Sequence, residues 1–150
     1  MTPEALAARR DLLALVLDAL VPQGDGFPGA GEVALDHVLA VAAASADLER
    51  LLARGLRAVE EASQTHDPAG FASLSVDDRE SVLRRVEPSH PAFFEALVRH
   101  TYDGYYSHPT VLARLGLDAS PPHPRGYRVE AVDPPDLARV RARGTLYRPA

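Results

Sequence analysis

The sequence predicts an all-α fold, with a single helical domain of about six helices over residues 1–117 and an extended proline-rich arm over residues 118–150. Three observations support this. Apolar residues recur at the three- and four-residue spacing of amphipathic helices. Ser and Pro stand where helices are expected to begin, and turn-forming Gly and Pro separate the periodic segments. The segment 127–132 alternates too weakly to predict a strand.

The first three predicted helices are delimited by caps and turns. A first helix begins at Pro3, which suits the first helical position, and runs to Leu20. The glycine- and proline-rich stretch 22–29 ends it, and a second helix follows over residues 30–44. Ser45 or the nearby Asp47 caps a third helix, which reaches residue 66.

The last three predicted helices follow the same signals. Ser75 is a favourable N-cap for a fourth helix, which must stop before Pro88. Pro91 occupies the first position of a fifth helix that runs to about Tyr106. A short sixth helix is expected over residues 110–115. Beyond it the chain is rich in proline and poor in apolar residues, which predicts an extended arm that is either disordered on its own or laid over a partner.

Composition excludes several classes of function. The chain has 150 residues, a net charge of −5 and no Cys. The negative charge argues against nucleic-acid binding, which requires a basic face. The lack of Cys excludes a disulfide framework, a thiolate zinc site and a cysteine nucleophile. No run reaches the roughly 18 apolar residues that a membrane span needs.

The N-terminal segment bears on localisation. Arg9 and Arg10 precede an apolar run, as in a twin-arginine signal, but Glu4, Asp11 and Asp18 interrupt the segment with acidic residues that such signals lack. We therefore expect the chain as given to be cytoplasmic. Periplasmic export is expected only if a partner carries the chain or if a leader is missing.

Aromatic residues concentrate in segment 93–109, which holds two of the 4 Phe and three of the 5 Tyr. Aromatic side chains dominate both cores and interfaces, so core packing and partner binding are both open interpretations. We predict that part of this segment contacts another protein, together with tyrosines of the arm. The predicted interface residues are Phe93, Tyr102, Tyr105, Tyr106, His108, Tyr127 and Tyr147.

Histidines supply the main candidate for chemistry. His100 and Asp103 are three residues apart on the predicted fifth helix, and His108 follows, so the three could hold a metal. His37 lies on the predicted second helix, close to acidic residues of that same helix. The paired Glu-x-x-His pattern, a Gly-x-Ser-x-Gly elbow and a strand-linked phosphate loop are all absent from the sequence. We therefore expect no metal, cofactor or catalytic residue in this chain. A stand-alone metal-dependent enzyme and a free helical adaptor or regulator are the alternatives.

Three segments in order carry a family resemblance. The first consists of residues 20–22 (Leu-Val-Pro), at the end of a predicted helix, and residues 28–33 (Pro-Gly-Ala-Gly-Glu-Val), after the loop that follows it. The second is 70–75 (Gly-Phe-Ala-Ser-Leu-Ser), before an arginine-rich helix. The third is the aromatic segment 93–109. Together they resemble the gluconate 2-dehydrogenase subunit 3 family, the small (gamma) subunits of bacterial flavin-dependent sugar and sugar-acid dehydrogenases.

The resemblance implies a helical accessory subunit without catalytic residues of its own. The expected partner is a large FAD-containing dehydrogenase subunit of the glucose–methanol–choline type, often with a cytochrome c subunit beside it. Members of the family commonly carry a twin-arginine signal, which this N-terminus does not match. The sequence thus predicts a small subunit that stabilises, matures or assembles a flavin-dependent sugar dehydrogenase.

Overall fold

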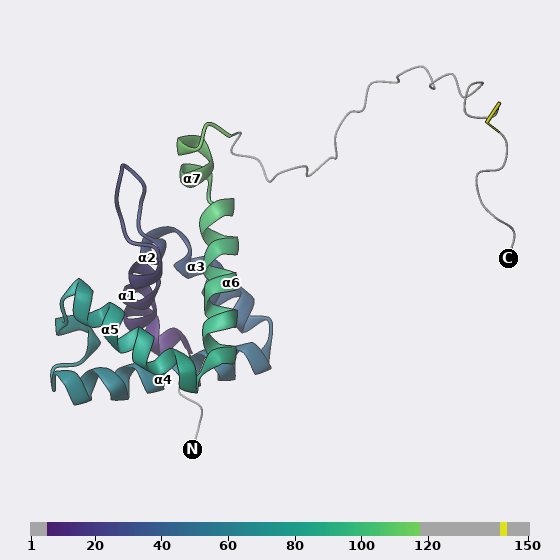
Figure 1. Ribbon diagram of the computed structural model, residues 1–150. Coiled ribbons are helices and arrows are strands. Elements are labelled where there is room, and N and C mark those ends of the chain that lie inside the picture. The colour runs from purple at the N-terminus through teal and green to yellow at the C-terminus, as the bar shows by residue number, and fades with distance from the viewer. Residues whose placement is uncertain (1–5, 118–141, 144–150) are drawn as a thin grey trace, which may run out of the picture.

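The computed structural model describes residues 6–117 and 142–143 and confirms an all-α fold (Figure 1). No β-strand occurs among these residues. Seven α-helices and three 3-10 helices make up the described part of the chain: η1 (Leu6–Arg9), α1 (Arg10–Leu20), α2 (Ala30–Val33), α3 (Leu35–Ala43), α4 (Ala46–His66), η2 (Phe71–Ser73), α5 (Val76–Val86), η3 (Glu87–Ser89), α6 (Pro91–Ser107) and α7 (Pro109–Arg114). The predicted arm lies outside the described residues apart from positions 142 and 143.

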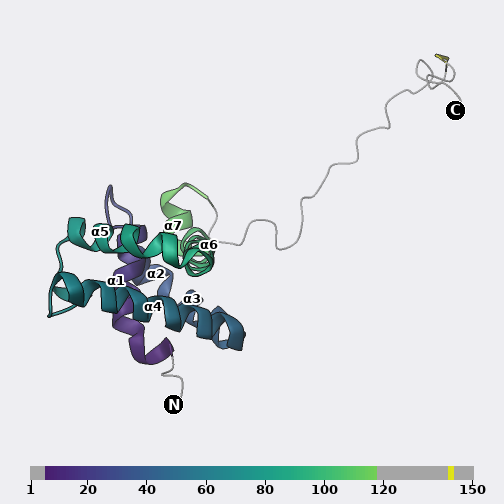
Figure 2. The same ribbon diagram turned by 60° about the horizontal axis from the view of Figure 1, so that its bottom comes forward.

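The helix α4 organises the fold. It has 21 residues and packs against α3, α5 and α6. In Figure 1, α4 runs along the base while α1 and α6 rise from it, and Figure 2 shows α3 and α4 on one level and α5 and α6 on another. The core between them is built largely from Leu and Val, with the two aromatic rings of Phe71 and Phe93 almost fully buried. Burial of these apolar side chains is the main stabilising term.

The predicted second helix is wrong in one respect, because the structure divides it at Ala34 into α2 and α3. The two halves pack on different neighbours, α2 mainly on α1 and α3 mainly on α6. Close contact with α1 depends on Gly31, where a Cβ atom would lie 2.4 Å from the carbonyl oxygen of Ala14. The chain therefore turns between the two halves so that each can reach its own partner.

The predicted helix caps are confirmed. The Ser45 hydroxyl accepts a hydrogen bond from the Leu48 amide at 3.3 Å, and the Ser75 hydroxyl accepts one from the Asp78 amide at 3.2 Å. Pro91 stands at the start of α6, as predicted. The expected start of the first helix at Pro3 falls outside the described residues. These caps satisfy amide groups that a helix leaves without an internal partner.

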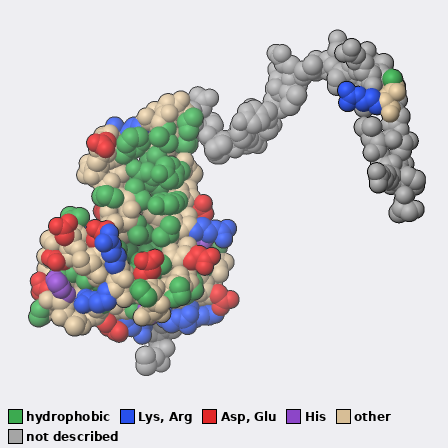
Figure 3. Space-filling model, in the orientation of Figure 1, with side chains coloured by type: hydrophobic (Ala, Val, Ile, Leu, Met, Phe, Trp, Pro, Cys, Tyr) green, Lys and Arg blue, Asp and Glu red, His purple; other side chains and the backbone are tan. Residues whose placement is uncertain are grey.

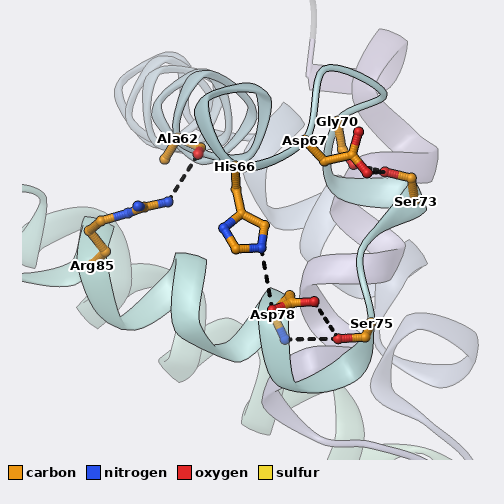
Figure 4. Close-up of polar contacts among 8 residues, drawn as sticks. All are labelled: Ala62, His66, Asp67, Gly70, Ser73, Ser75, Asp78 and Arg85. Carbon is orange, nitrogen blue, oxygen red and sulfur yellow. Dashed lines mark hydrogen bonds and ion pairs between the residues drawn. The ribbon is translucent and has the colours of Figure 1, made fainter.

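The end of α4 is fastened to α5 by a group of polar contacts (Figure 4). The Arg85 guanidinium donates to the Ala62 carbonyl at 3.0 Å, and His66 Nε2 lies 3.3 Å from Asp78 Oδ1. Asp67 accepts hydrogen bonds from the Ala69 amide and the Ser73 hydroxyl, at 2.8 and 3.1 Å. These contacts organise the turn between the two helices and assign His66 a structural role.

The glycine-rich loop between α1 and α2 is a tight hairpin. Gly24 and Phe27 exchange backbone hydrogen bonds of 3.2 and 2.8 Å. Asp25 and Gly26 between them have φ values of 49° and 80°, the left-handed values that a two-residue hairpin turn requires. Phe27 packs partly buried against the core. The loop thus serves as a helix connector and not as a phosphate loop between a strand and a helix.

Candidate partner interface and neighbouring polar sites

The helix α6 buries one face and exposes another. Tyr102 and Tyr106 are 46% and 53% exposed, and their rings meet edge to face with centroids 5.9 Å apart. We call these two residues the tyrosine patch. In Figure 3, hydrophobic side chains gather along α6 towards α7 on the face shown. The buried side of α6 consists of Phe93, Phe94, Leu97, Thr101, Gly104 and Tyr105.

The structure changes the predicted role of two interface residues. Phe93 is only 1% exposed and Tyr105 only 4%, so neither presents a surface to a partner. The Phe93 ring occupies a slot over Gly55 of α4, which has no side chain to block it. Tyr105 turns inward on α6, whereas Tyr102 turns outward. Tyr127 and Tyr147 lie outside the described residues.

Tyr105 connects the tyrosine patch to the core. Its hydroxyl donates a hydrogen bond of 3.0 Å to the buried Pro28 carbonyl, and its ring lies edge to face with Tyr106 at 5.2 Å. Burial raises the pKa of Tyr105 above its usual value of 10.0, and the neighbouring Tyr106 raises it further. The patch therefore rests on a ring that is fixed to the loop before α2.

Replacing Tyr105 with phenylalanine is expected to lower the free energy of unfolding by about 1–3 kcal/mol near neutral pH, because the buried Pro28 carbonyl loses its donor. The difference should shrink as pH rises above 10.0, since the folded wild type keeps the tyrosine protonated while the unfolded chain ionises. Urea unfolding at several pH values measures both effects. The exposed Tyr102→Phe variant is the matched control. Equal stability of Tyr105→Phe and wild type would contradict the assigned hydrogen bond.

The predicted metal-binding trio is only partly assembled. His108 caps α7, where its Nδ1 accepts a hydrogen bond from the Thr110 amide at 3.3 Å. His37 of α3 takes the place expected for His108: the ligand atoms of His37, His100 and Asp103 all lie within 4.8 Å of one another. No other such group of three His or acidic residues occurs in the described part of the chain. Sequence spacing had no signal for this contact, because it joins two helices that are distant in the chain.

A cleft of about 300 Å³ lies beside α1 and α5. Its charged groups include Asp18 and Arg79, and both are engaged in holding the backbone. Asp18 accepts the Gly31 amide at 2.7 Å, while Arg79 donates to the carbonyls of Phe71 and Ala72 at 3.2 and 2.8 Å. None of the described residues that line the cleft is a Ser or a His that could serve as nucleophile or base. The lining residues are Asp18, Ala19, Pro22, Gln23, Gly29, Glu32, Val76 and Arg79.

Each of the three sequence segments singled out above takes part in one of these long-range contacts, and one contact joins the first segment to the third. Asp18 accepts the Gly31 amide of the first segment, Arg79 donates to the Phe71 carbonyl of the second, and the Tyr105 hydroxyl of the third donates to the Pro28 carbonyl of the first. Among the described residues, no helix is both long and apolar enough to cross a membrane.

Comparison with known proteins gives one match. The family model described as gluconate 2-dehydrogenase subunit 3 matches residues 7–118. No curated protein and no solved structure matches the chain. The matched range covers α1 to α7 and both partners of the Tyr105–Pro28 hydrogen bond. The chain belongs to the gluconate 2-dehydrogenase subunit 3 family.

Proposed function

We propose that this chain is the non-catalytic small subunit of a flavin-dependent sugar dehydrogenase. In this proposal it binds the large, FAD-containing subunit and stabilises, matures or assembles it. Membership of a family named for a dehydrogenase subunit supports a role within a multi-subunit enzyme. The observation that carries the proposal furthest is the tyrosine patch, because two adjacent half-exposed tyrosines are typical of a protein contact.

Two charged groups of the cleft support an accessory role. Asp18 and Arg79 line the cleft, but both are committed to backbone contacts that maintain the fold. The proposal therefore assigns the redox chemistry to the flavin of the partner and no redox step to this chain. A cytochrome c subunit, where such a complex has one, would receive electrons from that flavin.

The patch is built for rigid presentation. Tyr102 and Tyr106 stand on a 17-residue helix whose other face is embedded in the core, and Tyr105 holds that helix to the loop at Pro28. Tyrosines lose few rotamers on binding, and a preorganised surface lowers the entropy cost of association. A subunit that binds only the folded partner stabilises that partner by mass action. This is the physical basis proposed for the assembly role.

The Tyr102→Ala/Tyr106→Ala double variant tests the proposal. Loss of an anchor residue in an interface costs on the order of 2 kcal/mol, or roughly thirtyfold in affinity. We expect the variant to fold normally and to lose the flavoprotein in affinity purification from the native cell. Absorbance of the purified material measures its flavin and haem content, which separates the large subunit from a cytochrome.

The matched control is Val76→Ala, because Val76 is 70% exposed and lies on α5, a different helix from the one that carries the patch. It should leave the yield and flavin content unchanged. Wild-type protein that is purified without any flavoprotein would favour a free adaptor over a subunit. Unchanged flavoprotein recovery with the double variant would place the interface elsewhere on the chain.

A further inference from the structure

A second feature of α6 lies beside α3 and has no part in the proposed interface. His100 and Asp103 occupy neighbouring positions on α6, with His100 Nδ1 3.8 Å from Asp103 Oδ2. His37 of α3 faces them, and the three ligand atoms lie within 4.8 Å of one another. Two imidazoles and a carboxylate are a donor set that divalent transition metals prefer.

The close packing of α3 on α6 brings His37 up to the α6 ligands. A Cβ atom at Gly104 would lie 2.9 Å from the Cβ of His37, so this glycine allows α6 to approach α3 closely. The Nε2 atom of His37 is buried and makes no hydrogen bond to any residue that the structure describes. A buried nitrogen without a partner costs free energy, and a metal ion would use its lone pair.

We propose that His37, His100 and Asp103 bind one divalent transition-metal ion of the Zn²⁺ type. Bonds of about 2.0–2.2 Å require the three ligand atoms to draw closer together. The Asp103 side chain is 55% exposed and the His100 side chain 17%, so Asp103 has room to rotate and the ion can enter from solvent. Water would complete the coordination.

The ion would act as a clamp between α3 and α6 and not as a reaction centre. The two helices contribute different ligands, so binding favours the folded arrangement over the unfolded chain. This inference revises the sequence-based expectation of no metal in the chain. That expectation considered His108 as the third ligand, whereas His108 is engaged at the start of α7. The inference does not depend on the proposed function.

Calorimetric titration of the full chain with Zn²⁺ tests the site. One saturable ion per chain is expected, with a rise in the thermal unfolding midpoint. The variants His37→Gln, His100→Gln and Asp103→Asn should each weaken binding by at least about tenfold, since even residues supporting a ligand contribute that much. Titration with Co²⁺, followed by its visible absorbance, reports whether imidazole nitrogen coordinates the ion.

Two controls separate this site from ordinary surface histidines. His108→Asn keeps an acceptor for the α7 cap and should bind Zn²⁺ as wild type does, and so should His66→Gln. Wild-type affinity in His37→Gln would overturn the proposal, as would the absence of saturable binding. If His37→Gln does not fold, the exposed Asp103→Asn variant decides: undiminished affinity there refutes the site.

Discussion

Replacing Phe93 with alanine is expected to lower the free energy of unfolding by about 3–5 kcal/mol. Phe93 is 1% exposed, and its ring packs edge to face on Phe94 with centroids 5.0 Å apart. Removing it leaves a cavity between α4 and α6 that the flanking helices cannot fill completely. Urea unfolding followed by circular dichroism measures the loss.

The matched control is Tyr106→Ala, which removes an aromatic ring from the same helix at a position that is 53% exposed. Tyr106→Ala should lower the free energy of unfolding far less than Phe93→Ala does. It should weaken partner binding more than a conservative substitution of a buried core residue does. A loss below about 1 kcal/mol for Phe93→Ala would contradict the buried placement of the ring.

Replacing Gly55 with alanine is expected to destabilise the protein by about 1–3 kcal/mol, through overpacking. Destabilisation by this substitution is unusual, because alanine inside a helix is ordinarily more stable than glycine by about 1 kcal/mol. At this position, however, a Cβ atom would lie 2.1 Å from the ring of Phe93. The ring is enclosed and cannot move aside without cost. Thermal and urea unfolding measure the change.

The second Phe93 variant, Phe93→Leu, identifies the cause. In that background the clash is relieved, so Gly55→Ala should become neutral or stabilising, and the two effects should not add. Arg57→Ala on the exposed side of α4 serves as the control and should change stability by less than about 0.5 kcal/mol. Stabilisation by Gly55→Ala in the wild-type background would refute the close approach of α4 and α6.

The helix α6 combines three properties on different sides of one element. Phe93 and its neighbours anchor it in the core, the tyrosine patch is presented outward, and His100 and Asp103 lie towards α3. The tests of the patch and of the metal site are therefore independent. A variant that loses flavoprotein binding but keeps its Zn²⁺ affinity bears only on the proposed interface. A variant that loses Zn²⁺ affinity but keeps flavoprotein binding bears only on the metal site.

Local chemistry explains why most helix boundaries could be predicted. The hydroxyls of Ser45 and Ser75 cap amide groups that lie within one helical turn of them. The fixed φ angle of Pro91 suits the first position of a helix. The division at Ala34 could not be predicted this way, because nothing in the local sequence breaks the helix. It follows from α2 and α3 packing on different neighbours.

The sequence by itself determined the all-α class, the caps and turns, the aromatic concentration on one helix and the resemblance to a family that the comparison then established. Only the tertiary structure decided which aromatic rings are exposed. Phe93 is buried because Gly55 leaves room for its ring, and His37 meets His100 because α3 packs on α6. Helical periodicity places residues around one axis, whereas these outcomes depend on contacts between helices that are distant in the chain, which no local pattern encodes.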